Sequence, residues 1–120
     1  MTHICIAKCT PKAYVAVVVF TETSIFTKQI TGLLSDEEYR IFQLELLRNP
    51  NAGALIRGSG GLRKILYAAS GKGKSGGIRV IYYLWTSDRI LLLTAYAKSA
   101  QENLTEAQLK KLRTFVEKNL

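Results

Sequence analysis

The sequence predicts a single α+β domain with the element order β-α-α-β-β-β-α and a mostly antiparallel sheet. Apolar, β-branched runs occur beside segments with helical periodicity, so both kinds of element are expected. The three strand-like runs of the second half follow one another with short connections, which favours antiparallel pairing. A chain of 120 residues is long enough for one domain with one hydrophobic core.

The first half of the chain predicts one strand followed by two helices. Residues 14–21 are rich in valine and almost wholly apolar, which is typical of a central strand buried on both faces. Residues 24–34 carry apolar side chains at helical spacing. Ser35 and Glu38 then form a capping box that opens a second helix, which runs to about Arg48. The apolar residues of this helix cover more than one face, so one side is expected to remain for a partner.

The second half predicts three strands and a last helix. The strands are residues 62–69, 78–86 and 90–98. Thr105 and Gln108 form another capping box, and the apolar residues after it follow one stripe of a helix. Residues 1–13 are weakly patterned and are interpreted as an N-terminal extension, which leaves residues 14–120 as the folded domain.

The charge of the chain is clustered. Seventeen Lys and Arg against nine Asp and Glu give a net charge of +8, and residues 46–87 contain no acidic residue. The cations of this span are Arg48, Arg57, Arg63, Lys64, Lys72, Lys74 and Arg79. Such a one-sign segment predicts a polyanionic partner. The alternative is a basic surface that only keeps the protein soluble.

The few potential metal ligands do not predict a metal site. Cys5 and Cys9 have only His3 nearby as a third ligand, whereas a structural zinc site needs about four. We therefore expect no metal and no cofactor. Two cysteines form no disulfide framework, which favours the reducing cytoplasm. The apolar run at residues 14–20 is too short to cross a bilayer.

The segment GKGKSGG, residues 71–77, invites comparison with a nucleotide-binding phosphate loop. That loop would need glycine at Ala68, and it would lead into a helix rather than the strand expected here. The segment is better interpreted as a basic hairpin tip in which Lys72 and Lys74 meet phosphate. A flexible and merely soluble tip is the alternative, and the flanking cations, Arg63, Lys64 and Arg79, argue against it.

Aromatic side chains accompany these cations on the predicted sheet. They are Tyr82, Tyr83, Trp85 and Tyr96. Sheet tyrosines more often belong to a core. Mixed with cations, however, they also suit RNA, because cations hold phosphates and rings stack on bases.

Several motifs together resemble the RelE/HigB superfamily of bacterial type II toxins, in particular its HigB-like branch. They are GLRK at residues 61–64, GKGKSGG followed by RVIYY, and AYAK at residues 95–98. The resemblance extends over about residues 17–120. It implies an mRNA interferase that enters the ribosomal A site, cuts mRNA and inhibits growth. It also implies an antitoxin partner, usually a helix-turn-helix protein.

Metal-independent RNA cleavage by the 2′-hydroxyl needs proton transfer and a stabilised phosphorane. The single histidine is far from the basic segment, so lysines and arginines are the candidates; a lysine crowded by cations has a lowered pKa. By resemblance, Arg79 stabilises the transition state and Lys64 is the base or an electrostatic partner. Tyr96 and Lys98 are implied as general acid or phosphate ligand. RNA-binding roles are expected for Arg57, Arg63, Lys72 and Lys74.

Leu66 departs from the family pattern, since relatives commonly carry a basic residue there. Either Lys72 or Lys74 replaces that cation, or cleavage is weakened. The alternative function is therefore a catalytically weakened RNA- or ribosome-binding module that an antitoxin regulates. A further alternative is a regulatory protein whose basic face only docks an acidic antitoxin.

Overall fold

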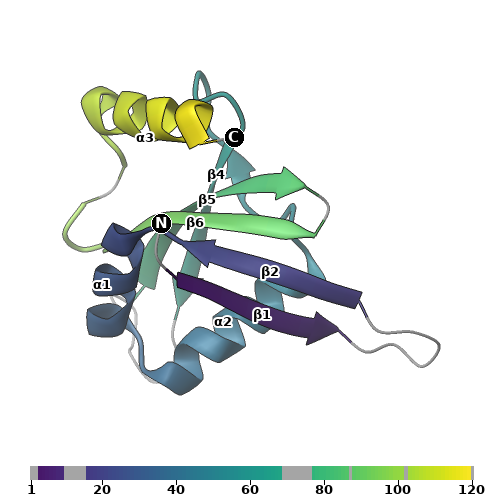
Figure 1. The fold of residues 1–120 in the computed structure, drawn as a ribbon. Coiled ribbons are helices and arrows are strands. Elements are labelled where there is room, and N and C mark those ends of the chain that lie inside the picture. The colour runs from purple at the N-terminus through teal and green to yellow at the C-terminus, as the bar shows by residue number, and fades with distance from the viewer. Residues whose placement is uncertain (1–2, 10–15, 69–76, 87, 102, 120) are drawn as a thin grey trace.

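The computed structural model describes residues 3–9, 16–68, 77–86, 88–101 and 103–119 (Figure 1). In chain order the elements are β1 (His3–Cys9), β2 (Ala16–Glu22), α1 (Ser24–Leu33), α2 (Asp36–Arg48), β3 (Ala54–Leu55), β4 (Leu62–Ala68), β5 (Gly77–Thr86), β6 (Arg89–Ala97) and α3 (Glu106–Asn119). The predicted α+β class is confirmed. Within the described parts, none of the helices has the length and apolar character needed to cross a membrane.

All six strands form one sheet in the order β1-β2-β6-β5-β4-β3. Neighbouring strands are antiparallel except for β2 and β6, which run parallel. The sheet is thus mostly antiparallel, as predicted. The apolar strand β2 lies between β1 and β6, inside the sheet, which agrees with the expectation for a valine-rich strand.

Two strands are not predicted from the sequence. His3–Cys9 forms β1 and pairs with β2 along its whole length, although this segment was expected to be a weakly patterned extension. β3 has only two residues and pairs with Arg63 and Lys64 of β4. Both strands lie at the sheet edges and depend on a neighbouring strand for their hydrogen bonds, so a local pattern does not reveal them. The domain boundary near residue 13 stays a prediction.

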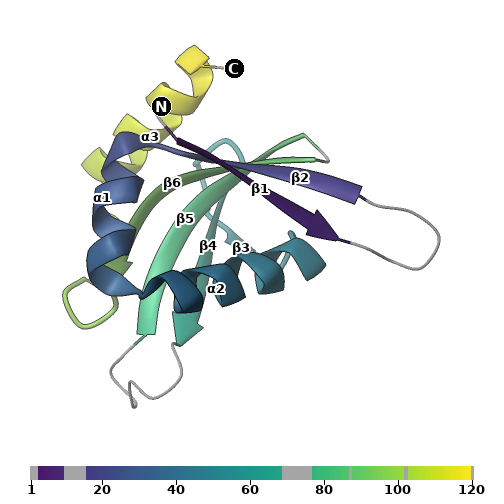
Figure 2. The ribbon, with the colours of Figure 1, turned by 60° about the horizontal axis from the view of Figure 1, so that its bottom comes forward.

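The helices cover both faces of the sheet (Figure 2). Under α1 and α2 lies the larger core, which contains Phe20, Phe26, Phe42, Val80, Tyr82 and Leu92. On the other face α3 packs over a smaller cluster made of Leu62, Ile81, Leu91, Leu93 and Val116. β5 contributes alternate residues to the two clusters, because successive side chains of a strand point to opposite faces.

Local capping signals place two helix starts correctly. The Ser35 N–H donates to Glu38 at 2.8 Å, and the Glu38 N–H donates to the Ser35 hydroxyl at 3.1 Å. Thr105 and Gln108 make the same reciprocal pair at 2.9 and 3.1 Å ahead of α3. Both predicted capping boxes are therefore confirmed.

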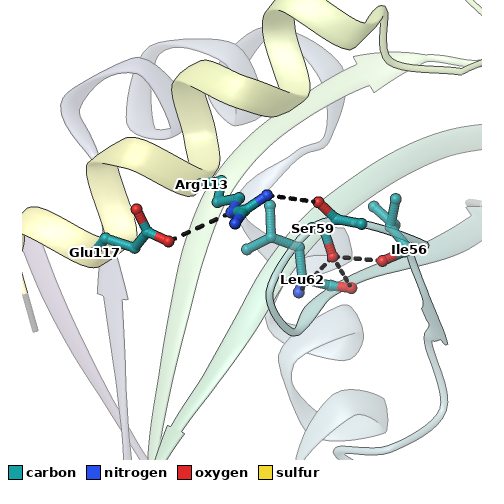
Figure 3. Close-up of polar contacts among 6 residues, drawn as sticks. Ile56, Ser59, Leu62, Arg113 and Glu117 are labelled. Carbon is teal, nitrogen blue, oxygen red and sulfur yellow. Dashed lines mark hydrogen bonds and ion pairs between the residues drawn. The ribbon is translucent and has the colours of Figure 1, made fainter.

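The loop between β3 and β4 is held against α3 (Figure 3). Gly58, Gly60 and Gly61 have φ of 72°, 76° and 112°, which side-chain-bearing residues rarely adopt. The buried Ser59 hydroxyl accepts from the Leu62 N–H at 3.0 Å and donates to the Ile56 carbonyl at 2.5 Å. From α3, Arg113 donates to the Gly58 carbonyl at 3.2 Å and pairs with Glu117 at 3.3 Å. The loop and the helix are thus fastened together.

Tyr82 belongs to the core rather than to an RNA-stacking surface. Its side chain is fully buried, and its hydroxyl donates to the Pro50 carbonyl at 2.7 Å and accepts from the Gly53 N–H at 2.9 Å. Burial raises the pKa of Tyr82, and the Gly53 backbone and the Arg63 charge offset part of that rise. The unfolded chain therefore loses this proton at a lower pH than the folded chain does.

This shift predicts an alkaline loss of stability. The contribution of Tyr82 to the free energy of unfolding should be fully present below about pH 10, the usual pKa of tyrosine. It should decrease as the pH rises further. We expect Tyr82→Phe to flatten this fall and to lower stability near neutral pH by about 1–3 kcal/mol, because two backbone groups lose their partner. Urea unfolding at neutral and alkaline pH measures both effects. A variant whose stability declines with pH as steeply as the wild type would contradict the assignment.

Candidate active site

The centre of the candidate site is a row of three side chains across neighbouring strands. Arg79 of β5 is directly opposite Leu66 of β4 and directly opposite Tyr96 of β6. Directly paired residues point to the same face of a sheet, so all three lie on the face that α3 partly covers. Arg79 and Tyr96 are half-buried, and Tyr96 packs against the cluster under α3.

Lys64 lies on the same face, two residues before Leu66 on β4. It pairs with Ile81, which makes Arg79 its diagonal neighbour across the β4–β5 ladder. Diagonal neighbours are within reach of long side chains. The Lys64 ammonium donates to Asn103 Oδ1 at 2.7 Å, from the segment that connects β6 to α3. The structure therefore places Lys64, Arg79 and Tyr96 on one face of the sheet, and their catalytic roles stay predictions.

The end of this face that carries Leu66 and Arg79 is open to solvent. Leu66, the partner of Arg79, is 45% exposed, although it is a large apolar side chain and is paired within the β4–β5 ladder. Lys98 follows directly after β6 and is exposed, and its backbone N–H donates to the Gly77 carbonyl at 3.0 Å. α3 thus covers the Leu62 end of the face and leaves the Arg79 end accessible.

Arg63 is separated from this group. It pairs with Tyr82, whose side chain is in the core under α1 and α2, so Arg63 points to the opposite face from Lys64. Its guanidinium donates to the backbone carbonyls of Gly53 at 2.6 Å and Asn51 at 3.3 Å. In the structure Arg63 therefore anchors the segment before β3, and its expected contact with RNA stays a prediction.

The other expected RNA-binding residues also lie apart from the row. Arg57 is exposed and lines a surface hollow beside α3, together with Glu106 and Glu117. Lys110 and Arg113 line the same hollow, so its charges are mixed rather than of one sign, and the contact of Arg57 with RNA stays a prediction. Lys72 and Lys74 fall outside the described residues, so their roles stay predictions.

Two further aromatic residues occupy the covered part of the face. Tyr83 and Trp85 pack at the cluster under α3, and Arg89 lies 5.9 Å from the Trp85 ring centre. Of the four aromatic residues expected near RNA, Tyr96 is thus the one beside Arg79. The described residues contain no grouping of three or more His, Cys, Asp or Glu side chains arranged to hold a metal ion.

Comparison with known families matches residues 53–120, more than half of the chain, to the RelE toxin of the RelE/RelB toxin–antitoxin system. The chain belongs to the RelE toxin family. The match contains β4, β5, β6 and α3, and with them all members of the row and Lys64. The resemblance to the RelE/HigB superfamily is thereby confirmed, and the HigB-like branch stays a prediction. As a RelE-family toxin, the protein has an antitoxin as its expected partner.

Asn103 is the site residue that sequence reasoning misses. It is separated from Lys64 by 39 positions along the chain. An asparagine in a connecting segment carries no pattern of its own that would indicate such a contact. Only the packing of the segment between β6 and α3 brings the two side chains together.

Proposed function

We propose that this RelE-family protein is a ribosome-dependent mRNA endonuclease of a type II toxin–antitoxin system, active in the cytoplasm. The observation that carries the proposal is the grouping of the half-buried side chains Arg79, Tyr96 and Lys64 on one face of the sheet of a RelE-family toxin. Cleavage proceeds without a metal: the 2′-hydroxyl attacks the adjacent phosphate, and the 5′-oxygen leaves. A helix-turn-helix antitoxin keeps the toxin silent.

Arg79 is the residue best suited to the phosphorane. A guanidinium presents a planar set of donors that matches two phosphate oxygens, and its charge persists at any physiological pH. Half-burial between Leu66 and Tyr96 restricts the side chain and reduces its exposure to water. Electrostatic stabilisation is stronger in such a setting than in bulk water.

Proton transfer falls to the neighbours of Arg79. We assign Lys64 as the group that promotes loss of the 2′-hydroxyl proton, either as the base or through its charge. We assign the phenolic O–H of Tyr96 to protonate the leaving oxygen; this hydroxyl is buried in the structure, so the role requires that RNA binding uncovers it. Lys98 is assigned to the phosphate, and Lys72 and Lys74 to the RNA backbone. The ribosomal A site supplies the orientation of the mRNA, which is a large part of such a rate enhancement.

Cleavage of mRNA on programmed ribosomes tests this proposal. Purified toxin is incubated with ribosomes that hold a defined mRNA codon in the A site, and new 5′ ends are mapped. The expected result is cutting within the A-site codon and little cutting of the same RNA when it is free in solution. Efficient cleavage of free RNA, or no cleavage on ribosomes, would contradict ribosome-dependent catalysis.

Leu66 favours one second candidate function, an RNA- or ribosome-binding module with weakened cleavage. An exposed leucine stands directly opposite Arg79, where the resemblance to the RelE/HigB superfamily implies a cation. Leucine donates no hydrogen bond to phosphate and adds no charge. The two candidate functions differ in the expected effect of Leu66→Lys, which restores a cation there, on the rate of cleavage.

We expect Leu66→Lys to tighten binding to the ribosome and to steepen the log–log salt dependence of binding by about one unit, because one more phosphate is contacted. Leu55→Lys is the matched control, since Leu55 is also exposed but pairs with Arg63 and so shares its face. Cosedimentation across a salt series measures the slope. A weakened nuclease also gains cleavage with Leu66→Lys. Equal slopes for the two variants would contradict a phosphate contact at position 66.

A further inference from the structure

A chain of hydrogen bonds links Lys64 to the beginning of α3. The Lys64 ammonium donates to the side-chain oxygen of Asn103 at 2.7 Å. The Gln101 side-chain N–H₂ donates at 2.7 Å both to the Asn103 backbone carbonyl and to the side-chain oxygen of Gln108. That same Gln108 oxygen accepts from the Thr105 N–H in the capping box. The site and the helix start are therefore joined by hydrogen bonds that run through the side chain and backbone of Asn103 and the side chains of Gln101 and Gln108.

We propose that Asn103 is a positioning residue that holds the Lys64 ammonium where it acts on RNA. The inference rests on the proposed nuclease function. Asn103 itself contacts no reacting atom. Gln101 supports it by fixing its backbone, and the capping box of α3 fixes Gln101 in turn. In this way the packing of α3 on the sheet sets the geometry of a residue that belongs to the open end of the face.

The chemistry of the contact suits positioning. A lysine ammonium sits on a flexible four-carbon stem with many rotamers, so an unheld ammonium samples many positions. The Asn103 oxygen takes one of the three ammonium donors and leaves two for RNA oxygens. Because the amide is neutral, it orients the ammonium without cancelling its charge. A carboxylate at the same place would instead compete with the RNA phosphate.

The test compares single-turnover cleavage on programmed ribosomes for Asn103→Ala, Asn103→Asp and the control Asn119→Ala. Asn119 supplies an exposed amide at the far end of α3, where it donates to the Phe115 carbonyl. We expect Asn103→Ala to lower the maximal cleavage rate roughly tenfold with nearly unchanged half-saturation, because Lys64 loses its orientation. Asn103→Asp is expected to raise the half-saturating concentration instead. Asn119→Ala should behave as the wild type.

A double variant separates positioning from a general effect on folding. In a Lys64→Ala background, Asn103→Ala should cost less than about twofold, since the group that Asn103 positions is already absent. A full tenfold further loss in that background would overturn the proposal. So would equal effects of Asn103→Ala and Asn119→Ala on the rate.

A spectroscopic readout remains informative independently of catalysis. With ¹⁵N-labelled lysine, the Lys64 ammonium should give a motionally restricted NMR signal that is lost in Asn103→Ala and retained in Asn119→Ala. A Lys64 signal that Asn103→Ala leaves unchanged would overturn the positioning contact. If the wild type fails to cut mRNA while this signal behaves as expected, the nuclease function fails and the Lys64–Asn103 contact stands.

Discussion

Replacement of Arg79 by alanine should abolish most of the cleavage and relieve growth arrest. We expect the cleavage rate on ribosomes to fall by roughly 10²–10³-fold, the loss typical of removing one donor that stabilises transition-state charge. The half-buried guanidinium has Leu66 on one side and Tyr96 on the other, so neither neighbour replaces its charge. Quantitative mapping of mRNA 5′ ends after induction, beside purified single-turnover rates, measures the effect.

Two variants make the Arg79 result specific. Arg79→Lys keeps the charge and loses the planar set of donors, so it should retain part of the activity. Arg40→Ala removes an equal charge from α2, where Arg40 pairs with Glu37 at 3.7 Å on the exposed helix surface, and should leave cleavage unchanged. Continued growth arrest by folded Arg79→Ala at equal expression would remove Arg79 from the mechanism.

Gly53→Ala should be the most damaging small change to the fold. A Cβ at Gly53 would lie 2.7 Å from the Tyr82 hydroxyl, 2.8 Å from its ring and 3.1 Å from the Lys64 carbonyl. Tyr82 is fully buried and unable to withdraw, so the segment before β3 must move. Overpacking of this kind costs about 1–3 kcal/mol. We expect a loss near the upper end of that range, because the same shift would also disturb the hydrogen bonds of Gly53 with Tyr82 and Arg63.

Gly32→Ala is the matched control for this substitution. Gly32 lies within α1, and a Cβ there would meet nothing within 4 Å. Alanine is favoured over glycine in a helix by about 0.5–1 kcal/mol, so this variant should gain stability. Urea unfolding of the two variants should therefore give shifts of opposite sign. A Gly53→Ala protein as stable as the wild type would contradict the close packing at Tyr82.

The elements with strong local signals were predictable. α2 begins after Ser35 and ends at Arg48, as its capping box and apolar spacing indicate. The three strands β4, β5 and β6 agree with their predicted ranges to within one residue at each end. The edge strands were not predictable, because β1 and β3 are defined by pairing with β2 and β4 rather than by their own composition.

The candidate site was predictable in part. Because side chains alternate along a strand, the range of β4 alone places Lys64 and Leu66 on one face and Arg63 on the other, as the structure has them. The sequence alone does not reveal that Arg63 is engaged by the carbonyls of Gly53 and Asn51 on its own face. A position in the acid-free segment, residues 46–87, is therefore not enough to place a cation on the same surface as Lys64 and Arg79.

What the sequence determines by itself is local: the helices and their caps, the alternation of each strand, and the concentration of cations in residues 46–87. These follow from hydrogen bonds and side-chain periodicity within a few residues. Only the tertiary structure decides that Arg79 stands between Leu66 and Tyr96, and that Asn103 reaches Lys64. The physical reason is that strand register and the packing of α3 bring together residues that are far apart along the chain. A local sequence pattern spans only a few residues and does not determine such contacts.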